Sequence, residues 1–147
     1  MNTVVRKFED TDPHGFPTID DFEAGKLDPE SFDHEAHVYI AWQLLEEDDL
    51  PLAAVRFTAA LKQITGKLGI ESKYHETISW FYMILIAERR ALQRRHDWKT
   101  FAGANPDLLS GPIRLLEQHY SSDRLWSALA KQQFLLPDRC AQESSHP

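Results

Sequence analysis

Apolar residues recur along this chain at the three- and four-residue spacing of amphipathic α-helices, and no segment alternates as a half-buried strand does. The pattern predicts an all-α fold built on three long helices. These are expected from Asp28 or Asp33 to about Glu47, from Leu50 to about Thr65, and from Ser72 to about Arg94. In the second helix, helical spacing is shown by the apolar series Leu52, Val55, Ala59 or Ala60, Leu61 and Ile64.

The third long helix has an unusual middle segment, because residues 78–87 are apolar on every side apart from Ser79. A helix without a polar face is normally surrounded by other elements. The sequence therefore predicts a central helix that is buried all round.

Turn and capping residues divide the rest of the chain into shorter helices. They are expected at about 18–25, 97–102, 110–119 and 122–134. Together with the long helices they predict a single-domain bundle over residues 18–137, preceded by a flexible arm at 1–17 and followed by a disordered tail at 138–147.

Charge and composition exclude several classes of protein. The 16 Lys and Arg residues against 23 Asp and Glu residues give a net charge of −7, which disfavours nucleic-acid binding. No apolar run approaches the ~18 residues that span a membrane. Cys140 is the only cysteine, which excludes an internal disulfide and fits a reducing compartment. The sequence predicts a cytoplasmic protein, and its oligomeric state leaves no trace in the pattern.

Two histidines mark the start of the first long helix. His34 and His37 are three residues apart and both fall within its apolar stripe, so two imidazole nitrogens can face one point. Neutral imidazole is the commonest nitrogen ligand of transition metals. The zinc-protease motif needs histidines four residues apart, so a peptidase is excluded. The pair predicts a metal site, although paired histidines of this kind are also found as ordinary core or surface residues.

A histidine and a carboxylate, His75 and Glu76, occur where the chain enters the central helix. A polar group buried at that point needs a partner, and a shared metal ion would provide one. We therefore predict His34, His37, His75 and Glu76 as metal ligands. Glu35 and Arg89 are candidates for supporting the ligands or anchoring a substrate, although an arginine at a helix end is commonly just solvated.

The two histidine segments resemble motifs of a widespread family of small, all-helical bacterial proteins, most of them without an assigned function. The resemblance rests on Phe32-x-His34-x-x-His37 with Ala41-Trp42 behind it, and on Lys73-Tyr74-His75-Glu76-Thr77. It extends through Asn105–Leu109, Leu125–Ser127 and Leu136–Asp138, and covers about Phe16 to Asp138. This group is in turn similar to the saposin-like non-haem diiron hydroxylase of platensimycin biosynthesis.

The resemblance implies one or two iron ions and an oxygen-dependent hydroxylation of a small apolar molecule that carries a carboxylate or a thioester. Three histidines and one carboxylate also suit manganese or zinc. The sequence therefore predicts a metal-binding enzyme with a small-molecule substrate, a non-haem iron oxygenase in the first place. Two alternatives stay open: a non-catalytic binding or interaction module with structural histidines, and a metal-dependent hydrolase.

Overall fold

The computed structural model describes residues 15–30, 32–94 and 97–140. Within these ranges the chain forms helices and no strand, so the all-α prediction is confirmed. None of the helices described is both long enough and apolar enough to cross a membrane. The elements are α1 (Ile19–Ala24), α2 (His34–Glu47), α3 (Leu50–Lys67), the 3₁₀ turn η1 (Glu71–Lys73), α4 (Glu76–Ala91), α5 (Trp98–Ala104), α6 (Pro106–Leu109), α7 (Pro112–Glu117), α8 (Ser122–Leu125) and α9 (Ala128–Gln132).

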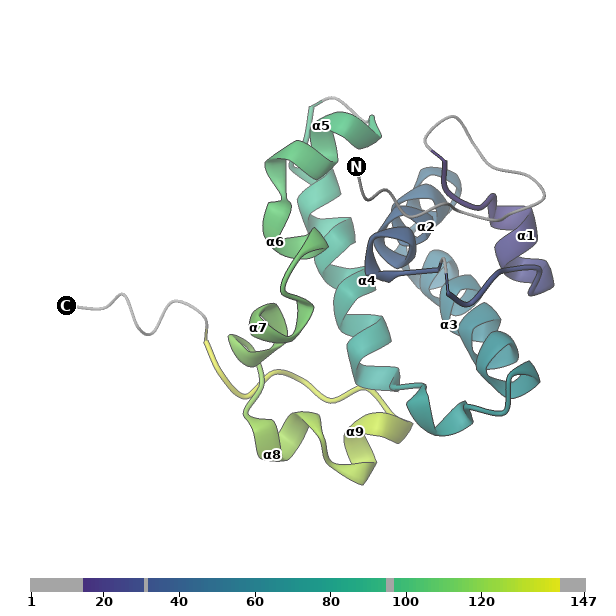
Figure 1. The fold of residues 1–147 in the computed structure, drawn as a ribbon. Helices are drawn as coiled ribbons and strands as arrows, with labels where there is room; N and C mark the ends of the chain where they lie inside the picture. The colour runs from purple at the N-terminus through teal and green to yellow at the C-terminus, as the bar shows by residue number, and fades with distance from the viewer. Residues whose placement is uncertain (1–14, 31, 95–96, 141–147) are drawn as a thin grey trace.

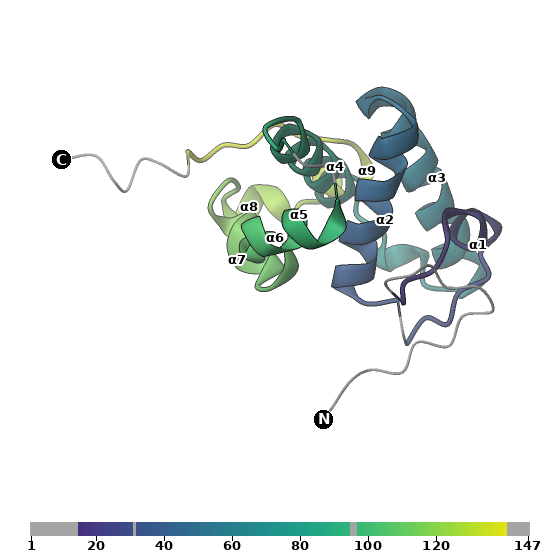
Figure 2. The same ribbon diagram turned by 90° about the horizontal axis from the view of Figure 1, so that it is seen from above.

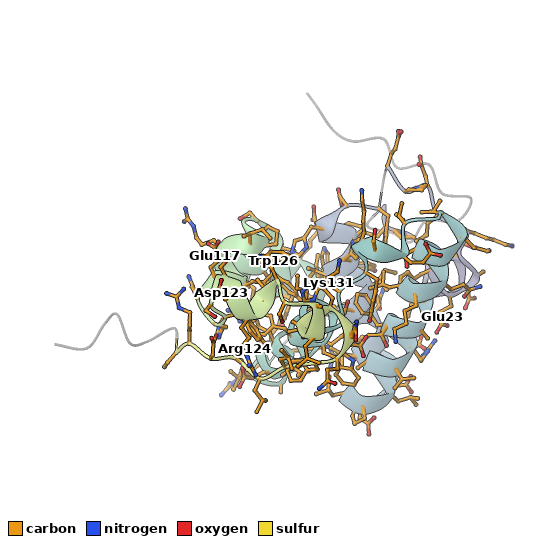
Figure 3. All side chains as sticks on the ribbon, turned by 90° about the horizontal axis from the view of Figure 1, so that it is seen from below. Glu23, Glu117, Asp123, Arg124, Trp126 and Lys131 are labelled. Atoms are coloured by element: carbon orange, nitrogen blue, oxygen red, sulfur yellow. The ribbon has the colours of Figure 1, made fainter. Side chains whose placement is uncertain are left out.

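Helix α4 occupies the middle of the molecule, as its apolar sequence predicts. The antiparallel pair α2 and α3, with α1 against it, lies on one side, and the short helices α5–α9 follow one another along the other (Figures 1 and 2). Seen from below, Asp123, Arg124 and Trp126 lie at the α8 end, far from Glu23 of α1 (Figure 3). The central helix is therefore in contact with both halves of the chain.

The prediction that the central helix is buried all round is wrong along one edge. Ile84 is 37% exposed, whereas Met83 and Ile86 are completely buried. Trp80 and Leu85 are only partly covered. The reason is that short helices lie against α4 in place of a fourth long one, and they leave a strip of it open.

Most element boundaries agree with the capping signals, and three differ. Helix α4 begins at Glu76 rather than near Ser72, because His75 is its N-cap. Helix α5 ends with Asn105 as its C-cap, and Pro106 then begins a further short helix, α6, at a position where its missing N–H costs nothing. The segment expected as one helix from 122 to 134 is two, because the Ser127 hydroxyl caps a new helix by accepting from the Ala130 N–H.

The buried face of α3 combines three alanines with Phe57, Thr58 and Leu61. Ala53, Ala54 and Ala60 are almost fully buried, while Leu52 and Val55 are 51% and 56% exposed. Two members of the apolar series, Leu52 and Val55, therefore lie on the exposed side of α3, whereas Leu61 is buried. The alanines allow α3 to approach α2 closely, and Phe57 and Leu61 are buried with them.

Parts of the expected arm and tail belong to the folded domain. Phe16 is 4% exposed and stacks on Tyr39 with ring centroids 4.5 Å apart. Near the other end, the Asp138 carboxylate accepts hydrogen bonds from the backbone and hydroxyl of Ser121. The remainder of both predictions, residues 1–14 and 141–147, falls outside the described residues.

Arg56 on α3 ties three elements together. Its guanidinium donates to Glu23 of α1, to Glu47 at the end of α2 and to Asp48, over 2.7–2.9 Å. One cation thus reduces the repulsion among three carboxylates in a chain whose net charge is already −7.

We expect Arg56→Met to lower the free energy of unfolding by about 1–2 kcal/mol, because three carboxylates lose their shared cation while the aliphatic stem is kept. Urea denaturation at low salt measures the loss, and about 1 M NaCl reduces it by screening the remaining repulsion. A loss that does not change with salt contradicts an electrostatic role for Arg56.

Candidate functional site

A cavity of about 280 Å³ opens between α2, α3, α4 and the start of α7. Its walls are mostly aliphatic and aromatic, with four polar side chains and no charged one among the described residues that line it. The lining residues are His34, His37, Val38, Ala41, Phe57, Leu61, Ile78, Ser79, Tyr82, Ile86, Pro112, Ile113 and Leu116.

His34 begins α2 at the edge of this cavity. Its Nε2 lies 2.7 Å from the carbonyl oxygen of Leu108 in α6. Because a carbonyl only accepts, Nε2 carries the proton and Nδ1 of the neutral ring keeps its lone pair. The ring also meets the edge of Tyr82, with centroids 5.2 Å apart. Contacts with α6 and α4 therefore fix both the tautomer and the orientation of His34.

His37 is held in the opposite tautomer. Its Nδ1 donates to the Asp33 carbonyl over 2.8 Å, and its ring stacks on Phe32 with centroids 4.0 Å apart. Nε2 of the neutral ring therefore keeps its lone pair. Burial is the main cause that lowers the pKa of His37, and neighbouring His34 acts in the same direction. His37 is accordingly a neutral hydrogen-bond acceptor at physiological pH.

The two unprotonated nitrogens belong to residues that line the cavity. Within the described residues, buried side-chain nitrogens without a partner occur elsewhere, for example at Trp42 Nε1 and Arg90 Nε. Neither His34 Nδ1 nor His37 Nε2 is among them. Since both residues line the cavity, we expect their lone pairs to accept from a donor on a molecule bound there.

The two hydroxyl groups on the cavity wall come from α4. Ser79 donates to the backbone carbonyl of His75 over 2.9 Å, and Tyr82 donates to that of Pro112 over 2.9 Å. Burial raises the pKa of Tyr82, so its phenol stays protonated. Each hydroxyl hydrogen is thus used within the protein.

His75 serves a different purpose from the histidine pair. Its Nδ1 accepts the Ile78 N–H over 3.2 Å and caps α4, while its Nε2 donates to the Leu125 carbonyl over 2.7 Å. Both ring nitrogens are therefore occupied, and His75 does not line the cavity. It joins the start of α4 to α8.

Glu76 is also engaged by its own surroundings. Its two carboxylate oxygens accept from the Tyr74 hydroxyl and from the Trp80 indole N–H, and Lys62 Nζ lies 3.5 Å from one of them. Burial and the Glu76 carboxylate raise the pKa of Tyr74. The carboxylate therefore connects the start of α4 with α3.

Thr77 completes the same motif and is fully buried. Its hydroxyl lies 2.7 Å from the Ala130 carbonyl and 2.8 Å from that of Gln133, and it accepts the Leu135 N–H over 3.1 Å. The segment that follows α9 is thus attached to the first turn of α4. His75 and Thr77 together therefore hold the C-terminal part of the domain against the start of α4.

The six residues predicted for the site are not brought together. His34 and His37 share the cavity, whereas His75 and Glu76 lie outside its lining. Across residues 15–30, 32–94 and 97–140, no three His, Cys, Asp or Glu side chains are close enough to hold one metal ion. Arg89 forms a two-bond ion pair with Asp107, and Glu35 lies in the first turn of α2 outside the cavity wall.

Sequence reasoning missed the other polar groups of the cavity. Helical spacing in the sequence places Tyr82 and Ser79 on one face with Ile86. The same face includes His75, which does not line the cavity, so the spacing alone does not identify the cavity residues. Which carbonyls fix the histidine tautomers has no sequence signal, since Leu108 lies 74 residues from His34. The cavity itself depends on four elements packing together.

We expect the protein to lose stability on acidification, because burial lowers the pKa of His37 and His75 from the ordinary value of 6.5. As the pH drops below 6.5, the unfolded chain binds more protons than the folded one. The free energy of unfolding therefore decreases as the pH decreases. The slope reaches at most about 1.4 kcal/mol per pH unit for each histidine. Urea denaturation from about pH 8 to about pH 5.5 measures it. Constant or rising stability over this range would contradict the burial of both rings.

We compared the chain with protein-family models, with curated proteins and with solved structures, and found no match in any of the three.

Proposed function

We propose that this protein binds a small, mostly apolar molecule in the cavity between α2, α3, α4 and α7. The observation that carries the proposal is the cavity wall, in which four polar side chains stand among aliphatic and aromatic ones. Binding pockets for small molecules commonly combine an apolar lining with a few polar groups. The proposal corresponds to a non-catalytic binding module in which His75 has a structural role. The single cysteine of the chain, Cys140, favours a cytoplasmic location.

The size of the cavity sets the size of the ligand. An apolar cavity of about 150 Å³ can hold benzene, so about 280 Å³ has room for a substituted ring or a short chain. Binding would replace water at Phe57, Leu61 and Ile86 by apolar contacts, at ~25 cal/mol per Å² of covered surface. For a ligand of this size, a dissociation constant of roughly 1 mM or below is expected.

Toluene tests the proposal, since it has no polar group. We expect saturable binding in an NMR titration, and we expect Ala41→Leu to weaken it at least tenfold, because the added carbons enter the cavity from α2. Ala59→Leu is the matched control, since Ala59 is an exposed residue of α3. Equal binding by both variants, or no saturable binding by the unmodified protein, would contradict the proposal.

A transition-metal function is the second candidate. His34 and His37 each donate one ring N–H to a backbone carbonyl, an arrangement usual for metal-bound imidazoles. Iron held there would supply oxygen activation beside the apolar cavity, as in the predicted oxygenase. Of the four expected ligands, only this pair lines the cavity, and His75 and Glu76 are hydrogen-bonded elsewhere.

Cobalt titration of untagged protein, followed by its visible absorption, tests this candidate. Metal bound by the histidine pair disappears in His34→Ala/His37→Ala and is unchanged in His75→Ala. Loss of binding in all of these variants would favour the four-ligand set instead. No absorption change in the unmodified protein would reject a metal site.

A further inference from the structure

We propose that the polar side chains of the cavity accept hydrogen bonds but donate none, so that the ligand is a neutral apolar molecule bearing a hydroxyl group. The inference rests on the proposed function and names the chemical class of its ligand.

The direction of each hydrogen bond made by the four polar side chains decides which of them can still donate to a ligand. His34 and His37 have given their N–H groups to the carbonyls of Leu108 and Asp33, and lone pairs remain on the other nitrogens. Ser79 and Tyr82 have given their hydroxyl hydrogens to the carbonyls of His75 and Pro112. Every polar side chain in the lining therefore has its hydrogen committed to the backbone.

The described part of the cavity lining also lacks a cation that could pair with an anionic ligand. Among the described residues, neither Lys nor Arg lines the cavity. Arg89, which was expected as an anchor for a carboxylate, is paired with Asp107 and bonded to Asn105. A carboxylate in the cavity would find acceptors on the side chains around it and no cation.

The consequence is selectivity for a ligand that brings its own donor. A hydroxyl can donate to His37 Nε2 or His34 Nδ1, the two ring nitrogens that keep a lone pair. An aldehyde or ketone of the same shape leaves its oxygen unpaired, and a carboxylate is buried as an unpaired charge, which costs far more. This differs from the carboxylate-bearing or thioester-bearing substrate that the family resemblance implies.

Four one-ring compounds separate these classes at about pH 8, where neutral imidazoles prevail. We expect benzyl alcohol to bind roughly threefold tighter than toluene and about tenfold tighter than benzaldehyde, with benzoate at least a hundredfold weaker. Isothermal titration or NMR measures all four.

The double variant His34→Phe/His37→Phe keeps two rings at the wall but removes both lone pairs. We expect it to bind benzyl alcohol no more tightly than toluene, while toluene binding changes less than threefold. His119→Phe is the matched control, because His119 packs on Phe81 outside the cavity and should leave the preference intact.

The outcomes separate the two proposals. If no compound binds, the proposed function fails. If toluene binds but benzaldehyde or benzoate binds as tightly as benzyl alcohol, the proposed binding function is supported and the inference about the ligand class is overturned. The backbone N–H groups at the start of α7 would then be the donors to examine. A preference for the alcohol that persists in a folded double variant also overturns it.

Discussion

Replacing Thr77 by valine should lower the free energy of unfolding by about 3 kcal/mol, the largest effect we expect from a change that keeps side-chain volume. The hydroxyl is fully buried and meets the Ala130 and Gln133 carbonyls and the Leu135 N–H. Valine leaves these backbone groups without that partner, at about 1–3 kcal/mol for each buried group left unpaired. Urea denaturation followed by circular dichroism measures the difference.

Thr58→Val is the matched control for this prediction. Thr58 is also buried, but its hydroxyl donates to the Ala54 carbonyl one turn earlier in α3, and its contact outside the helix is with the Tyr74 side chain rather than with the backbone of a distant segment. We expect Thr58→Val to cost less than about 1 kcal/mol. Equal losses in the two variants would show that Thr77 does not attach the C-terminal segment to α4.

His75→Ala should lower the free energy of unfolding by about 2–3 kcal/mol, and the loss should be the same in excess EDTA. The change removes the cap on α4, the bond to the Leu125 carbonyl and a ring that packs edge-on to Trp126. An N-cap contributes ~1 kcal/mol, and a buried hydrogen bond contributes a similar amount. Thermal and urea denaturation with and without the chelator measure the loss.

His75→Asn separates the N-cap contribution from the hydrogen bond to Leu125 and the packing on Trp126. Asparagine is among the best N-cap residues, but it cannot reproduce the imidazole ring. We expect it to recover about 1 kcal/mol relative to alanine. A His75→Ala variant that is destabilised only when metal is available would contradict a purely structural role and return His75 to the predicted ligand set.

Much of the fold follows from local signals in the sequence. Thr18 and Gly25 bound α1 as their capping chemistry predicts, and Asp33 rather than Asp28 caps α2. These signals act within one turn, so a single segment contains them. The exposed edge of α4 at Ile84 could not be predicted in this way, because it depends on how far the short helices extend over a distant surface.

The candidate site could be predicted in part. Helical spacing places His34 and His37 together, and both line the cavity. The same reasoning cannot distinguish a ligand from a cap at His75, because its role depends on the Leu125 carbonyl 50 residues away. Nor does spacing reveal that Glu76 is held by Tyr74 and Trp80, two neighbours that a metal would have to displace.

The central claim is that a small apolar molecule occupies the cavity between α2, α3, α4 and α7. Intermolecular nuclear Overhauser effects between toluene and the protein test it most directly, because they identify the protons in contact. We expect contacts from toluene to the methyl groups of Leu61, Ile78 and Ile86, and none to Leu125, which is buried outside the cavity. Contacts spread over exposed residues such as Leu52 and Leu136, with none to Leu61, Ile78 or Ile86, would contradict it.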